Sequence, residues 1–252
     1  MRMNISPLFL YQFFLSTIII VFFYFYIKLQ IFNMAPKIAY YFRITQHYSI
    51  EMAKGVVELP LVVLFHIAFS VILMSLFSVP LNTLGFTFSN VALYLLVGVL
   101  LGIGMMSFSS LLCRAVIEIL RHIPKPCFAL EIKDWLVMTR SGWLRHYFHT
   151  IDVLSLPLAL SIIFAQICCE EIVFRGILLH YFLPAGLCEA LMGSTILFMF
   201  MQLFHMPNLM SSIFPWIGSM VIGVVNGILY LKQGDLLPLI IAHFTFFIVA
   251  VL

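Results

Sequence analysis

Two adjacent glutamates and an arginine, Glu170, Glu171 and Arg175, stand in a stretch of the chain that is otherwise apolar. No charged residue occurs from Val153 to Cys169 or from Gly176 to Cys188. A charged side chain near the centre of a bilayer costs roughly 2.5–3.5 kcal/mol on insertion scales, so such groups are normally paired or used in chemistry. The cluster is therefore a candidate functional site. The alternative is a buried ion network that only fixes helix packing.

Helical geometry indicates how these charges are paired. Glu171 and Arg175 are four residues apart, which places them on one helix face within reach of an ion pair. Glu170 projects about 100° away from Glu171 on the same helix, which leaves it without a partner there. We therefore expect the partner of Glu170 to come from elsewhere in the chain.

Two histidines, His205 and His243, stand deep in other apolar stretches and are candidates for that partner. Counted at about 1.5 Å per residue, both lie within about 10 Å of the membrane depth of Glu170. A carboxylate that faces imidazoles in a water-accessible cavity can activate a water as a general base, while a second imidazole donates to the developing oxyanion. His66 and His180 lack such company, and we interpret them as structural or interfacial.

The same three side chains, Glu170, His205 and His243, would also suit a divalent metal such as zinc, as in sites built from two histidines and one carboxylate. The helical H-E-x-x-H spacing of zinc peptidases is absent, because the two histidines belong to different spans. A direct glutamate mechanism and a metal-assisted mechanism therefore both stay open, and no other cofactor is indicated.

The composition is that of a membrane protein, since 63% of the 252 residues are hydrophobic and 9% are charged, against roughly 25% charged residues in soluble domains. We predict an all-α fold, a polytopic transmembrane helical bundle of about seven spans, each near the length that the hydrocarbon core requires. The predicted spans are Leu8–Ile27, Leu59–Pro80, Leu84–Cys113, Leu158–Phe182, Leu187–His205, Ser212–Leu231 and Leu236–Leu252.

The basic residues predict how these spans are oriented. Ten of the thirteen Lys and Arg lie in two polar segments, Asn33–Glu58, with Lys28 at its edge, and Arg114–Asp152. Both segments follow odd-numbered spans, so the positive-inside rule places them together in the cytoplasm. The net charge of +3 thus reflects orientation, and we expect membrane lipid but no nucleic acid as a partner. The expected location is the plasma (inner) membrane, or an endomembrane in a eukaryotic cell.

The chain divides into two parts at the end of the second polar segment. Residues 1–152 hold the first spans and the basic loops, and no motif in them indicates a function. Near the end of this part, aromatic residues such as Trp143 and Tyr147 alternate with basic ones, which suits either a helix at the membrane interface or a solvated loop. Residues 153–252 hold four predicted spans and the candidate site residues, so we predict that they form the catalytic core.

Three motifs of this core resemble a known family in their order and spacing. They are E-E-I-V-F-R-G from Glu170 to Gly176, an apolar helix ending in His205, and the run from Gly227 to His243 that contains K-Q-G-D-L-L-P. From roughly Leu158 to the C-terminus, the chain is similar to the CPBP family of intramembrane glutamic endopeptidases. That family includes the type II CAAX prenyl endopeptidases and the bacteriocin-processing and self-immunity proteins.

The resemblance implies a role for each of five residues. Glu170 resembles the general base of the family, and His205 the histidine that aids it in activating water. Glu171 and Arg175 complete the motif E-E-x-x-x-R. His243 resembles the histidine that donates to the oxyanion.

Two positions depart from the family pattern. Met201 stands where the family has an aromatic residue four positions before the first histidine, and Phe247 stands where it has an asparagine four positions after His243. A phenyl ring cannot donate to an oxyanion, and losing one such donor typically costs about 10²–10³ in rate. Asn226 of the preceding span is a candidate auxiliary donor; the alternative is that it only bonds a neighbouring helix.

We predict a membrane-embedded endopeptidase, of full or reduced activity, that hydrolyses a peptide bond with a water activated by Glu170 and His205. The expected substrate is a peptide or protein, either lipidated or carrying a leader peptide. Two other classes stay open. One is a non-catalytic binding or bacteriocin self-immunity protein of the same fold, which Phe247 favours. The other is a proton-coupled transporter with Glu and His relays inside its spans.

Overall fold

The computed structural model describes residues 6–42, 44–46, 48–87, 90–122, 143–203, 206 and 209–251. Within these ranges the chain is helical and contains no strand. The elements in chain order are α1 (Pro7–Val21), η1 (Phe22–Ile27), α2 (Lys28–Tyr41), η2 (Ile44–Gln46), α3 (Ile50–Leu76), η3 (Leu81–Leu84), α4 (Val91–Arg121), α6 (Trp143–Val153), α7 (Leu156–Glu171), η5 (Ile172–Leu178), α8 (Leu179–Phe182), η6 (Leu183–Ala185), α9 (Leu187–Leu203), α10 (Leu209–Gln233) and α11 (Leu237–Val251). Of these, η1 and η5 are π-helical, and the other η elements are 3₁₀ turns.

The predicted all-α membrane bundle is confirmed. In the described part of the chain, five helical stretches are long and apolar enough to cross a membrane, and two shorter apolar helices bring the total to the expected seven. The long stretches are Pro7–Tyr41, Met52–Leu76, Val91–Leu120, Leu156–Ala185 and Ser211–Gln233, and the shorter ones are Leu187–Gln202 and Leu237–Val251. The chain is therefore a multi-pass membrane protein.

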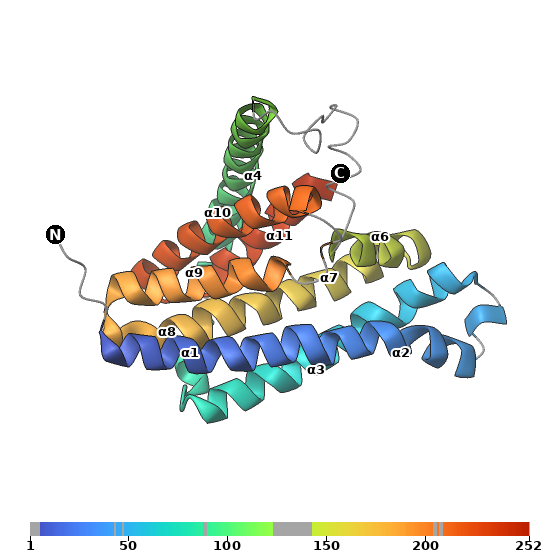
Figure 1. Cartoon of the computed structure of the whole chain (residues 1–252), viewed down its shortest axis with the longest axis horizontal. Helices are drawn as coiled ribbons and strands as arrows, with labels where there is room; N and C mark the ends of the chain where they lie inside the picture. Colours follow the sequence, from blue (N-terminus) through green and yellow to red (C-terminus); the bar gives the residue numbers. More distant parts are fainter. Residues whose placement is uncertain are drawn as a thin grey trace.

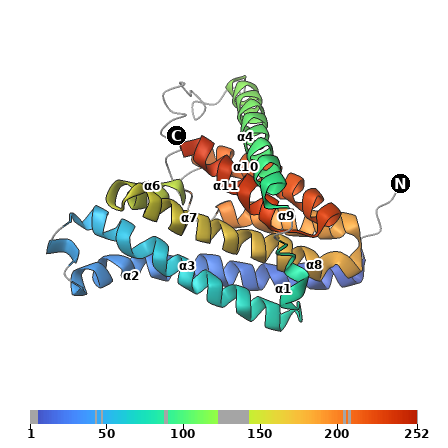
Figure 2. The ribbon, with the colours of Figure 1, turned by 180° about the vertical axis from the view of Figure 1, so that it is seen from behind.

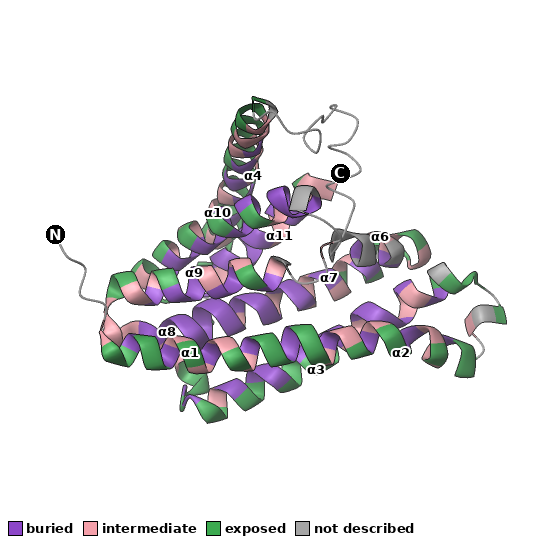
Figure 3. Ribbon diagram, in the orientation of Figure 1, coloured by how far each residue is buried: buried purple, intermediate pink, exposed green. Residues whose placement is uncertain are grey.

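The continuous helix formed by α7, η5 and α8 lies at the centre of the bundle. In Figures 1 and 2 it passes between α1 and α3 on one side and α9, α10 and α11 on the other. Both α3 and α11 pack on α7, while α9 packs on η5 and α8. Figure 3 shows the central helix as mostly buried, whereas α1 and α3 expose much of their outer surface. Charges on the central helix are thus shielded from lipid.

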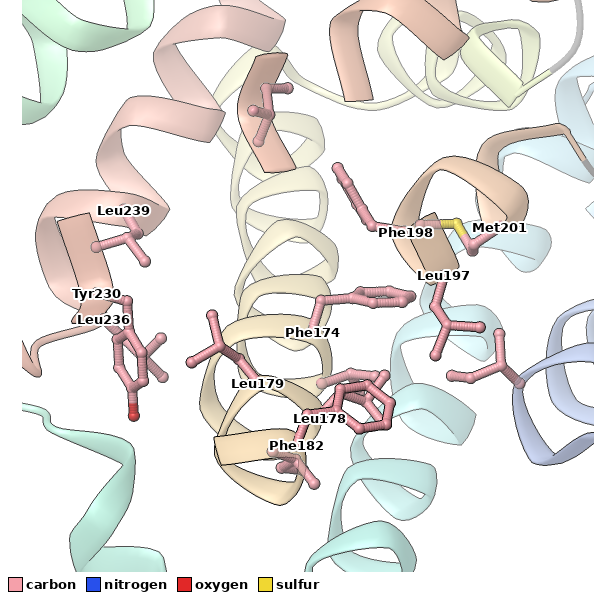
Figure 4. Packing of buried hydrophobic residues seen from close by; sticks show 14 of the residues in the cluster. Phe174, Leu178, Leu179, Phe182, Leu197, Phe198, Met201, Tyr230, Leu236 and Leu239 are labelled. Atoms are coloured by element: carbon pink, nitrogen blue, oxygen red, sulfur yellow. The ribbon is translucent and has the colours of Figure 1, made fainter. Parts of the chain in front are cut away.

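Apolar side chains of the central helix form most of the core. Figure 4 shows Phe174 and Phe182 among the side chains that fill the space between α9 on one side and α10 and α11 on the other. The same core continues into the first part of the chain, for example at Ile20 of α1 and Leu73 of α3. Within a membrane, van der Waals packing between the helices is what holds such a core together. The two predicted parts therefore share one core, and a functional boundary near residue 152 stays a prediction.

The first polar segment is shorter than expected. The predicted segment Asn33–Glu58 is largely helical, because α2 continues to Tyr41 and α3 begins at Ile50. Lys28, which we expected at the edge of a loop, is instead buried with 1% of its surface exposed. Its Nζ atom lies 5.3 Å from the ring centroid of Tyr24, which favours a buried cation. Counting charges along the sequence cannot distinguish such a buried lysine from a loop lysine.

Contacts at the two ends of the bundle agree with the predicted topology. At one end, the Thr150 hydroxyl of α6 donates to the Gly55 carbonyl near the start of α3, at 3.1 Å, so the ends of the two basic segments lie together. At the other end, the Tyr230 hydroxyl donates to the Thr83 carbonyl at 2.9 Å, and Leu236 N–H donates to the Gly85 carbonyl at 2.8 Å. Which end faces the cytoplasm stays a prediction.

Two glycines of α4 allow a close approach to α11. A Cβ atom added at Gly98 would lie 2.6 Å from the Ile241 side chain, and one at Gly102 would lie 2.5 Å from the Ala242 carbonyl oxygen. Small residues four apart let membrane helices pack backbone to backbone. This contact fixes the turn of α11 that carries His243 against α4.

Candidate active site

The two adjacent glutamates face different surroundings. Glu170 lines a cavity of about 650 Å³, which includes its opening to the outside, and His243 lines the same cavity. Most of the wall is apolar and includes Phe198, Phe214 and Phe247. Glu170 is thus the acidic side chain that a molecule in this cavity would meet.

Glu171 lies behind that wall in a buried ion cluster. Its Oε1 atom accepts hydrogen bonds from Arg175 Nη1 at 3.1 Å and from His243 Nδ1 at 2.7 Å. The predicted ion pair between Glu171 and Arg175 is therefore confirmed, and both side chains are almost fully buried. The Arg175 guanidinium carbon also lies 4.3 Å from the ring centroid of Phe198, at cation–π distance.

The backbone changes from α-helical to π-helical directly after the glutamate pair. α7 ends at Glu171, and η5 runs from Ile172 to Leu178 and carries Arg175. A π-helical turn is wider than an α-helical turn and leaves carbonyls without their usual partners, and such turns occur frequently at functional sites. Ser194 of α9 donates to the Phe174 carbonyl at 2.5 Å and so holds α9 against this stretch.

The partner of Glu170 differs from the one that we expected. Gln166, one turn earlier on the same helix, donates from Nε2 to Glu170 Oε1 at 3.0 Å. The expectation that the partner comes from elsewhere in the chain is therefore wrong, because it considered charged partners and overlooked a neutral amide. The same Nε2 atom lies 3.0 Å from Nδ1 of His66 on α3, so a histidine that we interpreted as lacking company belongs to the site.

The structure locates most of the remaining candidate residues. His243 lines the cavity, but its Nδ1 is bonded to Glu171 and not to Glu170. Asn226 donates from Nδ2 to the Leu239 carbonyl at 3.2 Å, and it is not part of the cavity wall. His205 lies outside the described residues.

The positions that depart from the family pattern are apolar and buried. Phe247 lines the cavity, and its ring centroid lies 4.9 Å from that of Tyr147 in an edge-to-face arrangement. Met201 is fully buried within the core. The described wall of the cavity thus has a phenyl ring where the family has a carboxamide.

Tyr147 of α6 is a site residue that the sequence did not reveal. It lines the cavity together with Glu170 and is buried. Burial raises the pKa of the Tyr147 phenol well above its usual value of 10.0, and the charge of Glu170 raises it further. The phenol therefore stays protonated at neutral pH and can donate a hydrogen bond. The only sequence signal was the mixture of aromatic and basic residues around it.

The described residues contain no group of three His, Cys, Asp or Glu side chains placed to hold a metal ion. The trio that the sequence suggested for zinc, Glu170, His205 and His243, includes a residue outside the described ranges. Within the trio, Glu170 Oε1 and His243 Nδ1 already have protein partners. A divalent metal at this trio therefore stays a prediction.

These features define a class: a polytopic membrane protein with a glutamate pair on its central helix and a histidine from another helix at an apolar cavity. The family model described as "Type II CAAX prenyl endopeptidase Rce1-like" matches residues 152–249, which confirms the resemblance of this part of the chain to that family. The matched family is a protease family. The match therefore supports the same general kind of function for this protein, that of a CAAX-type intramembrane protease. No curated protein and no solved structure matches the chain.

Proposed function

We propose that this protein is an intramembrane endopeptidase in which the Glu170 carboxylate activates the attacking water. The observation that carries this proposal is the difference between the surroundings of the two glutamates. Glu170 lines the apolar cavity together with His243. Glu171 instead accepts hydrogen bonds from Arg175 and from Nδ1 of His243. This arrangement supports a chemical role for Glu170 and a structural role for Glu171.

The proposed reaction is a direct hydrolysis. Glu170 takes a proton from a water molecule, and the resulting hydroxide adds to the carbonyl carbon of the scissile peptide bond. His243 is held through Nδ1 by Glu171, and its Nε2 can donate to the oxyanion that forms on the carbonyl oxygen when the ring carries both protons. When the C–N bond breaks, Glu170 returns its proton to the leaving amine. The resemblance assigns His205 to the activation of water, and this role stays an expectation.

We further propose that the substrate is a peptide with a large apolar group near its cleavage site. The cavity wall offers the aromatic rings of Tyr147, Phe198, Phe214 and Phe247, and its charged or titratable groups include Glu170 and His243. A prenylated C-terminal peptide fits this chemistry and the name of the matched family, and a leader peptide with an apolar segment is the second candidate.

Cleavage of synthetic peptides by the detergent-purified protein tests this proposal. A prenylated peptide with a C-terminal CAAX sequence should be cut at one bond near the lipid, and the same peptide without the lipid should be cut more slowly. Product masses identify the bond. Equal cleavage of both peptides would overturn the proposed substrate class, and cleavage of neither peptide, nor of a leader peptide, would overturn the enzyme assignment. Activity before and after chelation, with zinc analysis, distinguishes a direct from a metal-assisted mechanism.

One observation favours a second function for the same fold. Phe247 presents an apolar wall where the family has a hydrogen-bond donor, which suits a protein that binds a peptide or lipid without turning it over. Such a binding or self-immunity protein would retain the substrate peptide at equilibrium in detergent, with no product even after long incubation.

A further inference from the structure

A chain of hydrogen bonds leads from Glu170 into the first part of the molecule. Gln166 Nε2 lies 3.0 Å from Glu170 Oε1 and 3.0 Å from His66 Nδ1. On the other side of the imidazole ring, His66 Nε2 lies 2.6 Å from the Tyr24 hydroxyl. Tyr24 belongs to η1 and His66 to α3, so three separate helices supply the chain.

The geometry fixes the direction of these hydrogen bonds. The Gln166 amide must present its NH₂ group to Glu170, since its oxygen would repel the carboxylate. The second hydrogen of the same NH₂ group then points to His66 Nδ1, which accepts it. An imidazole that accepts at Nδ1 carries its proton at Nε2 and donates that proton to the Tyr24 oxygen. The chain therefore has one consistent arrangement.

The side chains that form this series of hydrogen bonds are enclosed within the protein. Tyr24, His66 and Gln166 are each fully buried. The His66 ring packs against Phe23 and Phe69, with ring centroids 5.4 and 6.3 Å away. Burying polar groups without partners would cost free energy, so the hydrogen bonds along this series favour a single geometry, although Gln166 Oε1 has no partner among the described residues. That geometry fixes the position of one oxygen of Glu170.

We propose that His66 and Tyr24 are positioning residues for the general base Glu170 and act on it through Gln166. This inference rests on the proposed function, and it extends the active site beyond residues 152–249, the region that matches the family. It also gives residues 1–152 of the polypeptide a role in the reaction. With one oxygen of Glu170 held by Gln166, the other oxygen is left to orient the water. Displacement of a catalytic group by about 1 Å can cost about 10²-fold in rate.

Three substitutions at His66 separate positioning from simple packing. In His66→Asn, the side-chain oxygen takes the place of Nδ1 and can still accept from Gln166, although the contact with Tyr24 is lost. In His66→Gln, the amide reaches the place of Nε2 and keeps the contact with Tyr24, but the acceptor for Gln166 is lost. His66→Leu removes both. We expect His66→Asn to retain most of the wild-type kcat, and the other two to lose about 10- to 100-fold in kcat with little change in KM.

The matched control is His180, the other histidine that the sequence did not distinguish from His66. It lies on α8 outside this chain of hydrogen bonds, and His180→Asn and His180→Leu should leave kcat unchanged. A wild-type kcat in His66→Leu would overturn the proposal. Equal losses of kcat in all three His66 variants, in proportion to their loss of thermal stability, would also overturn it, because that pattern describes packing alone.

A second measurement does not depend on cleavage. The melting temperatures of His66→Leu, Gln166→Leu and the double variant should be non-additive, because the two side chains share a contact. Additive changes would overturn the proposed chain whether or not a peptide is cut. A different result is also informative: His66 and Gln166 are coupled, but the wild type and Glu170→Gln cleave the peptide equally fast. That result would refute the proposed function. It would also overturn the positioning role, because the hydrogen bonds would then only stabilise the fold.

Discussion

His243 Nδ1 lies 2.7 Å from Glu171 Oε1, so the second glutamate of the pair, and not the first, holds the histidine of the last helix. The same oxygen accepts from Arg175, which makes Glu171 the centre of a three-residue cluster. Glu170, one residue earlier, is left facing the cavity. Adjacent residues of the same type therefore have different surroundings because they project from different sides of one helix.

Removal of one member of the ion cluster should reduce stability together with activity. Glu171→Gln and Arg175→Ala each leave a buried charge without its partner, which typically costs about 3–5 kcal/mol. We expect a clear fall in melting temperature and in yield for both variants. The control is Glu189→Gln, which changes a glutamate in the first turn of α9, outside the cluster, and should leave the melting temperature nearly unchanged. An Arg175→Ala protein as stable as the wild type would show that the ion pair contributes nothing.

The sequence predicted the parts of this site that depend on local spacing. The Glu171–Arg175 pair follows from a separation of four residues on a helix, and the apolar runs predicted the spans to within a few residues at most ends. The placement of Glu170 and His243 at one cavity agrees with the depth argument.

The parts that the sequence missed depend on contacts between distant segments or on neutral groups. His66 and Tyr147 reach the site from α3 and α6, and an isolated polar residue in an apolar run gives no sign of which helix it will contact. Gln166 was overlooked because a neutral amide is not an obvious partner for a carboxylate. Lys28 and His66 are both buried, and the charge pattern along the sequence does not indicate this burial.

The residue that replaces the family asparagine gives a test of the oxyanion site. Phe247→Asn places a carboxamide one turn from His243 on the same helix face, next to the same cavity. We expect kcat to rise by up to about 10²-fold, the contribution of one donor. An unchanged kcat would indicate that Phe247 is not at the position of the donor, and would favour the binding function if the wild type is also inactive.

Asn226 provides the complementary test. Its amide donates to the Leu239 carbonyl, so we expect Asn226→Ala to lower the melting temperature, while kcat of the remaining folded protein changes by less than about threefold. A loss of about 10²-fold in kcat without a loss of stability would show that Asn226 supplies the oxyanion donor instead.

Tyr147 should make stability depend on alkaline pH. The pKa of this phenol is raised by burial and by Glu170, so the unfolded chain loses the proton first as pH rises. The contribution of Tyr147 to stability is therefore complete below its usual pKa of 10.0 and is lost as pH rises through the higher folded value. Melting temperatures measured from about pH 9 to 11 should fall less steeply in Tyr147→Phe than in the wild type. Parallel curves would contradict the buried, protonated phenol.

The topology can be tested with reporter fusions. The positive-inside rule and the contact between α6 and α3 place residues 42–49 and the segment Arg114–Asp152 on one side, which we expect to be the cytoplasm. A fusion at Gln233–Asp235 should report the opposite side. Different sides for the first two fusions would contradict the arrangement of the spans.

The most direct test of the account compares the wild type with Glu170→Gln on the same lipidated peptide, at equal concentrations of folded protein. The amide keeps the shape of the side chain and removes the base, so the melting temperature should change little. The cleavage rate should fall by at least the 10²–10⁴-fold that a general base typically contributes, to about the level without protein. Cleavage by Glu170→Gln at the wild-type rate would contradict the account, because water would then be activated elsewhere.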